Sequence, residues 1–311
     1  MDIVYCFDSN YNIQALCSIN SLINNSDTEI NLHIIHDNPE SFKKNLNNYS
    51  KFKFISSLKV YQFKSDLKFP ALENSHVSKA TYYRMFISSY ISKDIENIVY
   101  LDPDVICIKN FSKIVKNLQK ELNKSDYVIS AISTPVNQEM KDTLLNRLKI
   151  DDKYFNAGVM LIDLKKWNKF GIEKKLLKRL NDLENNITYW DQDVLNSYFN
   201  GNYMELPNEL NYMLAATNTT KKFYKMIREK IIFLHYVGNL KPWTVKGGLF
   251  LTSEFYHQSY SELNLDKYHI ITKYKLSTFY QLINGIITLK IFNLKQPIKY
   301  IYLVLKLILR K

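Results

Sequence analysis

One short stretch of the sequence places two acidic side chains directly after an apolar run. Residues Ile98 to Leu101 are four consecutive apolar or β-favouring residues, a pattern that is typical of a buried strand. Asp102 and Asp104 follow at the carboxyl end of that strand, and Pro103 between them ends its hydrogen-bond ladder. Ligands of open α/β sheets bind beyond the carboxyl ends of the strands. The stretch therefore predicts a buried strand that delivers two carboxylates to a binding site.

Two carboxylates so close together repel each other unless a cation lies between them. A hard divalent ion such as Mg²⁺ or Mn²⁺ prefers oxygen ligands and often bridges to a substrate phosphate. The alternative is a turn in which Asp102 or Asp104 caps a neighbouring segment, which requires no metal. An Asp-x-Asp pair by itself is a weak motif, so other segments must decide between the two.

The first hundred residues alternate strand and helix patterns. Strands are predicted at Asp2 to Phe7, Ile30 to His36 and within Phe52 to Phe63, and helices at Ile13 to Ile23 and from Pro39. This alternation predicts an α/β fold of a nucleotide-binding type, whose sheet is parallel in its main part. The sequence has neither a G-x-G-x-x-G fingerprint nor a P-loop lysine motif, so a bound metal is the expected holder of phosphates.

Composition narrows the class of protein. With 311 residues, 46% of them hydrophobic, the chain can bury a large core. Cys6, Cys17 and Cys107 have no zinc or disulfide spacing and predict buried thiols in a reducing compartment. Asp2 stands where a signal peptide needs basic residues, so no export is expected.

The formal net charge of +12 is concentrated at the C-terminal end. From residue 271 onward there is no acidic residue and there are eight basic ones: Lys273, Lys275, Lys290, Lys295, Lys299, Lys306, Arg310 and Lys311. These 8 charges are two-thirds of the +12, which leaves the first 270 residues only mildly basic. The sequence therefore predicts no nucleic-acid groove and no nucleic-acid partner.

Two segments in the middle of the chain carry polar residues among apolar ones. In the helix predicted at Ser78 to Ile91, Arg84 has apolar neighbours, and a buried guanidinium needs an anionic partner. The strand predicted at Tyr154 to Asp163 is interrupted at residues 156 to 158 by small side chains, which let the backbone approach a ligand. A β-bulge without a ligand is the alternative for that interruption.

Two later segments carry acids, an amide, an imidazole and an ammonium group. The helix beginning in Ile187 to Phe199 bears Asp191, Gln192 and Asp193, which either complement the helix dipole or hold sugar hydroxyls. Both interpretations stay open at this point. A strand then ends at His235, and Gly238 and Lys241 follow within seven residues. This grouping favours a ligand site, because the imidazole can bind a metal and the ammonium a diphosphate.

With these segments in order, the chain resembles the retaining glycosyltransferases of family 8, and among them the bacterial lipooligosaccharide and lipopolysaccharide α-galactosyltransferases and glucosyltransferases. The motifs that carry the resemblance are FDSNY, TYYR, YLDPDV, YFNAGVMLIDLKKW, WDQDVLN and HYVGNLKPW. The resemblance implies a GT-A fold, with a Rossmann-like, mostly parallel mixed sheet and flanking helices. It also implies a UDP-sugar donor bound through Mn²⁺, with Mg²⁺ as the second choice.

The resemblance assigns roles to individual positions. It implies that Asp102, Asp104 and His235 bind the metal and that Gly238 and Lys241 bind the diphosphate. It implies that Asp8, Asn10 and Tyr11 contact the uridine. The residues that it assigns to the donor-sugar pocket are Arg84, Asn156, Ala157, Asp191 and Gln192.

The implied reaction moves galactose or glucose from a UDP-hexose to a saccharide or glycolipid acceptor with retention of configuration. Gln192 lies near the reacting carbon in this family, and Asp191 or Gln192 remains open as a covalent nucleophile. Front-face attack assisted by the leaving phosphate is the expected route.

Three positions depart from the family pattern. Cys6 and Phe7 stand where small residues are common beside the uracil. Ser133 stands where the closest relatives have an acid that faces the acceptor. We therefore expect a UDP-hexose donor but a different acceptor.

The chain is expected to have a catalytic domain at 1–255 and a basic amphipathic helical tail at 256–311. Pro297 is predicted to open the last helix, with its lysines on one narrow arc, and no run approaches the ~20 apolar residues of a spanning helix. Such a tail predicts attachment to an anionic membrane surface, at the inner face of the bacterial cytoplasmic membrane. Docking on the catalytic domain or on a partner subunit is the alternative.

Two other classes of function are alternatives to a transferase. A phosphotransferase of the haloacid dehalogenase type also places Asp-x-Asp after an apolar strand, but usually on the first strand and with Thr or Val where this chain has Ile106. A non-catalytic nucleotide-sugar-binding protein would require loss of a metal ligand or of the pair Asp191 and Gln192, and neither is lost.

Overall fold

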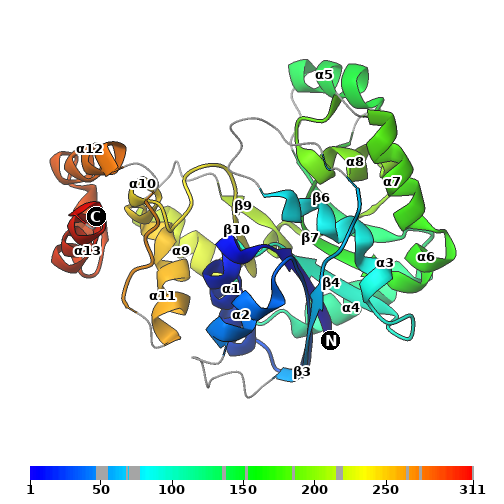
Figure 1. Cartoon of the computed structure of the whole chain (residues 1–311), viewed down its shortest axis with the longest axis horizontal. Coiled ribbons are helices and arrows are strands. Elements are labelled where there is room, and N and C mark those ends of the chain that lie inside the picture. Colours follow the sequence, from blue (N-terminus) through cyan, green and yellow to red (C-terminus); the bar gives the residue numbers. More distant parts are fainter. Residues whose placement is uncertain are drawn as a thin grey trace.

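The computed structural model describes residues 1–46, 55–67, 69, 78–134, 138–150, 153–183, 186–214, 220–263, 266–272 and 275–309. It is an α/β fold in which helices flank a central mixed sheet (Figure 1). The predicted fold class is therefore confirmed. Residues 52–54 of the third predicted strand lie outside the described residues, as do Lys273, Arg310 and Lys311 of the tail.

The central sheet has the strand order β3-β2-β1-β4-β7-β6-β8. In that order the strands are Ile55–Gln62, Ile30–His36, Asp2–Phe7, Asn97–Leu101, Phe155–Asp163, Ile129–Ser133 and Met204–Glu205. The pairs from β3 to β4 and the pair β6-β8 are parallel, whereas β7 runs antiparallel to both of its neighbours. The sheet is thus mostly parallel, because short helical crossovers join its first strands.

Helices cover both faces of this sheet. The longer ones up to residue 262 are α1 (Asn12–Asn24), α2 (Pro39–Leu46), α4 (Ser112–Lys124), α5 (Gln138–Leu148), α7 (Ile172–Leu183), α8 (Trp190–Phe199), α9 (Lys221–Lys230) and α11 (Glu254–Glu262). Strand β1 alternates between two hydrophobic cores: Ile3 and Tyr5 join the core that contains α1, and Val4 and Cys6 join the core that contains α7 and α8. Burial on both faces explains why β1 and β4 consist almost entirely of consecutive apolar residues.

Two predicted helices differ in detail from the structure. Ser78 caps the segment that follows it, as predicted, but Lys79–Phe86 (η2) is a 3-10 helix that continues as α3 (Ile87–Tyr90). The sequence also predicts one polar helix at Lys165 to Leu183, and in the structure this segment forms two helices, α6 (Leu164–Lys169) and α7. They separate at Gly171, whose φ of +61° is a left-handed conformation that favours glycine.

A second, three-stranded sheet has the order β5-β10-β9. Its strands are Val105–Cys107 (β5), Phe233–Tyr236 (β10) and Tyr212–Leu214 (β9). In the antiparallel pair of β5 and β10, His235 lies opposite Val105. This register brings His235 beside Asp104, although the two residues are far apart in the sequence.

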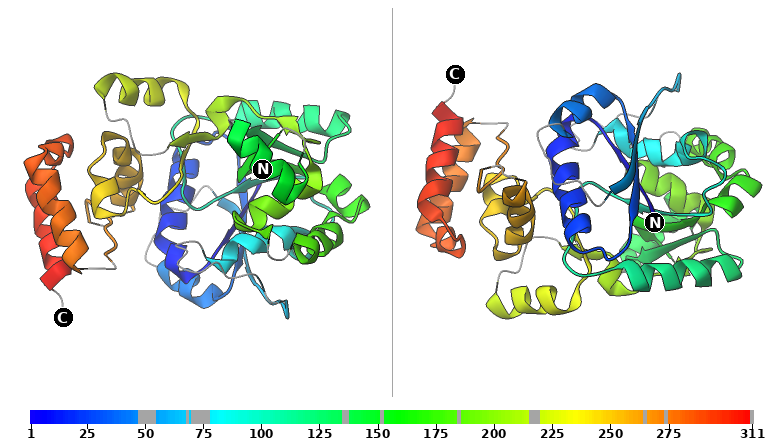
Figure 2. Two further views of the ribbon diagram at one scale, coloured as in Figure 1. Left: turned by 90° about the horizontal axis from the view of Figure 1, so that it is seen from above. Right: turned by 90° about the horizontal axis from the view of Figure 1, so that it is seen from below.

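The C-terminal helices form a separate layer at one end of the molecule (Figure 2). They are α12 (Lys275–Ile287), η6 (Lys290–Asn293) and α13 (Pro297–Leu309), and Pro297 opens the last helix as predicted. Leu282, Tyr300 and Val304 pack with the short helix α10 (Val245–Gly248) in a third hydrophobic cluster. Within the described residues, no helix has both the length and the apolar character needed to cross a bilayer.

Candidate active site

A cleft of about 490 Å³ opens at the carboxyl ends of β1 and β4. Twelve of the thirteen predicted site residues line it: Asp8, Tyr11, Arg84, Asp102, Asp104, Asn156, Ala157, Asp191, Gln192, His235, Gly238 and Lys241. Within the described structure the thirteenth, Asn10, instead donates from its backbone and side-chain nitrogens to Asp8, at 2.9 and 3.3 Å. The fold thus collects nearly all the candidates at one edge of the sheet.

Asp102, Asp104 and His235 form a cluster whose ligand atoms all lie within 4.8 Å of one another. His235 Nε2 lies 3.3 Å from Asp104 Oδ1, and this buried oxygen receives no hydrogen bond from the residues that the structure describes. Carboxylate oxygens and an imidazole nitrogen are suitable ligands for a divalent cation. The cluster therefore fits the metal interpretation of the Asp-x-Asp pair.

Gly158 of β7 makes room for this cluster. A Cβ atom at this position would lie 2.2 Å from His235 Cε1 and 3.0 Å from Asp102 Oδ2. The small side chains of this strand were predicted to allow a ligand to approach, and at Gly158 the close neighbour is the His235 ring. The strand pair β6-β7 also has a register shift here, between Ser130 and Ile132, of the kind that the alternative of a β-bulge predicts.

Lys241 lies at the metal end of the cleft. Its Nζ is 2.7 Å from Asp104 Oδ2 and also donates to the carbonyl oxygen of Tyr236. Although burial by itself raises the pKa of Asp104, the Lys241 ammonium holds it well below its usual range. Gly238 precedes Lys241 with a φ of +74°, which explains why glycine occupies this turn.

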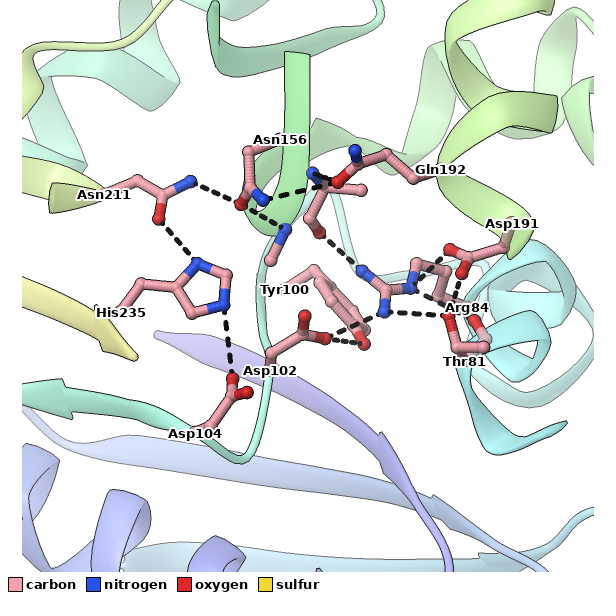
Figure 3. A network of polar contacts seen from close by, with 12 residues as sticks. Thr81, Arg84, Tyr100, Asp102, Asp104, Asn156, Asp191, Gln192, Asn211 and His235 are labelled. Carbon is pink, nitrogen blue, oxygen red and sulfur yellow. Dashed lines mark hydrogen bonds and ion pairs between the residues drawn. The ribbon is translucent and has the colours of Figure 1, made fainter. Parts of the chain in front are cut away.

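Arg84 connects the metal end of the cleft to its other end (Figure 3). Its Nη2 lies 2.9 Å from Asp102 Oδ1, and its Nε lies 2.8 Å from Asp191 Oδ2. It also donates to the carbonyl oxygen of Ala157 at 2.6 Å and stacks over the Tyr100 ring at 4.5 Å. The anionic partners expected for a buried Arg84 are therefore these two aspartates.

Asp191 is almost fully buried in the first turn of α8. Its carboxylate accepts a hydrogen bond from the Thr81 hydroxyl and pairs with Arg84. Burial raises the pKa of Asp191 to about 7, because desolvation, aided by the charge of Asp102, outweighs the opposing effect of the guanidinium.

The other two polar residues of that turn have different roles. Gln192 Oε1 accepts from the Ala157 N–H at 3.2 Å and from Asn156 Nδ2 at 3.3 Å, so it faces the cleft. Asp193 is instead bonded to the N–H groups of Thr188 and Tyr189, at 2.7 and 2.8 Å. Asp193 therefore stabilises the turn before α8.

Asp8, which follows β1, also lines the cleft. Its Oδ2 accepts from the Ser78 hydroxyl at 2.5 Å, which joins the β1–η1 turn to the start of η2. Tyr11 lines the cleft as well and contacts the Trp243 ring edge to face.

The sequence did not single out Tyr100, Thr81 or Asn211. Tyr100 donates to Asp102 at 2.7 Å, and Asn211 contacts His235 at 3.0 Å. Tyr100 and Thr81 lie in the motifs YLDPDV and TYYR, where the sequence predicts only a strand residue and a helix residue. Asn211 stands alone before β9 and had no local signal.

The geometry agrees with what comparison with known proteins shows. A model described as "Glycosyl transferase family 8" matches residues 2–247.

The chain belongs to glycosyltransferase family 8.

Individual relatives agree with this assignment. The Lipopolysaccharide 1,2-glucosyltransferase of Escherichia coli K12 is 30% identical over 257 residues, which cover 78% of this chain and 72% of that protein. General stress protein A of Bacillus subtilis is 28% identical over 280 residues, which cover 85% and 95% respectively. A crystal structure of a galactosyltransferase in complex with donor and acceptor sugar analogs matches with a TM-score of 0.68 at 24% identity, and covers 86% of this chain and 97% of that one. The likeness in structure confirms the predicted GT-A fold.

The departures from the family 8 pattern lie at the cleft and its rim. Cys6 and Phe7 line the cleft. Ser133 is bonded through its N–H and its hydroxyl to Glu205, both at 2.7 Å. The carboxylate of Glu205, in β8, therefore lies beside Ser133.

The substitution Gly158→Ala should displace the His235 ring, because the added Cβ atom would overlap with it. It should therefore lower the affinity for Mn²⁺ by roughly tenfold or more, as the loss of ligand orientation does in other metal sites. Isothermal titration calorimetry with Mn²⁺ measures this effect, and circular dichroism checks that the variant folds. His235→Ala provides the reference for complete loss of the imidazole. A folded Gly158→Ala protein with unchanged Mn²⁺ affinity would contradict the role given to this glycine.

Asp191 should make stability depend on pH. A carboxyl group with a pKa of about 7 when folded and about 3.8 when unfolded binds more protons in the folded state, so the free energy of unfolding falls as pH rises between these values, by at most about 4 kcal/mol. Urea unfolding at pH 5 and pH 8 should show a smaller fall in Asp191→Asn than in the wild type. The same substitution at the exposed Asp182 should leave the fall unchanged. Equal falls in all three proteins would contradict the prediction.

Proposed function

We propose that this chain transfers a hexose, glucose or galactose, from a UDP-sugar to a saccharide acceptor with retention of configuration. The observation that carries the proposal is the cluster of Asp102, Asp104 and His235 at the edge of the sheet, in the same cleft as Arg84 and Asp191. One end of the cleft offers a site for a divalent cation and a diphosphate. The other offers polar side chains that suit a sugar.

The proposed donor lies along this cleft. Asp8 and Tyr11 contact the uridine, Gly238 and Lys241 contact the diphosphate, and Asn156 and Ala157 contact the sugar together with Arg84, Asp191 and Gln192. Asn10 supports the uridine end through Asp8, because both of its nitrogens donate to that carboxylate. In this arrangement the sugar–phosphate bond lies between the cation site and Gln192.

The leaving group determines the chemistry. A bound divalent cation, with Mn²⁺ the preferred ion and Mg²⁺ the second choice, supplies positive charge that stabilises the diphosphate as it leaves. Lys241 adds an ammonium group at the same end of the cleft. Asp102, Asp104 and His235 hold the ion, and Arg84 orients Asp102.

Two features favour front-face attack over a covalent intermediate. Asp191 is paired with Arg84 and accepts from Thr81, which lowers its nucleophilicity. Gln192 Oε1 already accepts two hydrogen bonds. The acceptor hydroxyl therefore attacks from the side on which the phosphate leaves, and that phosphate takes its proton.

The acceptor is proposed to belong to lipopolysaccharide, lipooligosaccharide or another cell-surface glycan. The name of the Escherichia coli relative supports this choice. Family 8 membership does not favour a haloacid-dehalogenase-type phosphotransferase. A non-catalytic sugar-nucleotide-binding protein is the remaining alternative, and the assay below distinguishes it.

Full-length protein should release UDP from UDP-glucose or UDP-galactose in the presence of Mn²⁺ and should stop when EDTA is added. Asp102→Ala should lower this rate by roughly 100-fold or more, because a metal contributes several kcal/mol to such a transition state. Asp94→Ala, an exposed site, is the matched control. Undiminished turnover in Asp102→Ala would overturn the proposal, release of inorganic phosphate would indicate a phosphotransferase, and binding without turnover would indicate a scaffold.

We further propose that the tail, residues 256–311, attaches the catalytic domain, residues 1–255, to the inner face of the bacterial cytoplasmic membrane. Several large apolar side chains of the tail are exposed, among them Leu276, Ile287, Leu289, Phe292, Ile298 and Leu309. Lys290 and Lys306 lie among them in the sequence, whereas Lys299 pairs with Asp266 at 2.8 Å. Since Tyr300 and Val304 are buried, α13 docks on the protein with one face and leaves another for a lipid surface.

Full-length chain should cosediment with vesicles that contain phosphatidylglycerol more strongly than with phosphatidylcholine vesicles. The double variant Ile287→Ser and Phe292→Ser should weaken this binding, because both side chains are more than two-thirds exposed, at 73% and 70%. Phe170→Ser, an exposed aromatic residue outside the tail, is the control. Equal binding of all three proteins to anionic vesicles would refute the membrane proposal.

A further inference from the structure

The His235 ring has a second nitrogen, and a side chain outside the predicted site holds it. Asn211 Oδ1 lies 3.0 Å from His235 Nδ1. Asn211 is only 1% exposed and follows η4 (Asn208–Leu210), immediately before β9. Because β9 pairs with β10, the backbone fixes Asn211 beside the imidazole.

Two backbone N–H groups determine how the amides near His235 are oriented. The Gly158 N–H can only donate, and it donates to Asn156 Oδ1 at 3.0 Å. The Ala157 N–H likewise donates to Gln192 Oε1 at 3.2 Å, and that oxygen also accepts from Asn156 Nδ2 at 3.3 Å. The Asn156 amide can therefore adopt only one orientation, with Oδ1 facing the Gly158 N–H and Nδ2 facing Gln192 Oε1.

The orientation of the Asn156 amide determines the orientation of the Asn211 amide. Since Asn156 Oδ1 is an acceptor, the group that faces it at 3.0 Å must be Asn211 Nδ2, a donor. Asn211 Oδ1 then faces His235 as an acceptor, so the proton of the neutral imidazole lies on Nδ1. Figure 3 shows this sequence of contacts from Gln192 through Asn156 and Asn211 to His235.

The other ring nitrogen is left with its lone pair. His235 Nε2 points toward Asp104 Oδ1 at 3.3 Å, and an unprotonated nitrogen cannot donate to that oxygen. Two acceptors that face each other are stabilised by a cation between them, and metal-bound histidines generally donate from their other nitrogen to a carbonyl-type oxygen.

We propose that Asn211 is a positioning residue that fixes the ring orientation and the Nδ1–H tautomer of His235, so that the Nε2 lone pair is directed at the divalent cation. The inference rests on the proposed function, because it requires that Asp102, Asp104 and His235 hold a metal. It also connects the metal site to the donor-sugar pocket, since Asn156 and Gln192 of that pocket orient the Asn211 amide.

Two substitutions at Asn211 separate positioning from simple packing. Asn211→Asp keeps an acceptor oxygen facing Nδ1, whereas Asn211→Leu has a similar size and offers none. Asn211→Leu should lower the affinity for Mn²⁺, without nucleotide, by roughly 10- to 100-fold, and Asn211→Asp should stay within a few-fold of the wild type. Asn208→Leu, at an exposed position three residues away, is the matched control and should bind Mn²⁺ as the wild type does.

Nuclear magnetic resonance of ¹⁵N-labelled histidine reports the tautomer directly. The wild type should show His235 protonated on Nδ1, with the signal assigned by its loss in His235→Ala, and Asn211→Leu should show a mixture of tautomers. If Asn211→Leu fails to fold, Asn156→Ala replaces it, because it removes the group that orients the Asn211 amide and should also give a mixture.

The outcomes distinguish this inference from the proposed function. No Mn²⁺ binding by the wild type would overturn the metal site and with it the proposed function. Normal wild-type binding, with equal affinity and an unchanged tautomer in Asn211→Leu, would overturn only the role of Asn211.

Discussion

The antiparallel pairing of β5 with β10 is the interaction on which the candidate site depends. Its register sets His235 opposite Val105, and Asp104 is the residue before Val105. Backbone hydrogen bonds between the two strands therefore bring an imidazole to a carboxylate that lies 131 positions earlier in the sequence (235 minus 104). Gly158 leaves the space that the ring needs, and Asn211 on the neighbouring strand reaches its far side.

Charge balance is the second constraint on the cleft. Three carboxylates, those of Asp102, Asp104 and Asp191, lie close together in a mostly buried position. Isolated buried charges are costly, and here each carboxylate has a cationic partner, Arg84 for Asp102 and Asp191 and Lys241 for Asp104. Because Arg84 contacts two of them, one guanidinium group links the cluster of Asp102, Asp104 and His235 to Asp191.

The C-terminal helices are attached to the segment that carries Lys241. The short helix α10 begins four residues after Lys241, and the Tyr300 hydroxyl of α13 donates to the Val245 carbonyl oxygen at 2.7 Å. A Cβ atom on Gly248 would lie 2.6 Å from that hydroxyl, so the helices can approach this closely only because residue 248 is glycine. The C-terminal helices therefore pack against the segment that follows Lys241.

The sequence by itself determined the fold class, most strand positions and twelve of the residues that line the cleft. Continuous apolar runs identify buried strands, and the polar residues that end them fall at one edge because parallel strands share a direction. Tertiary structure alone decided the roles of Gly158, Asn211 and Glu205. Each acts on a residue from another segment, and the packing of those segments against one another, which no local pattern encodes, brings the residues together.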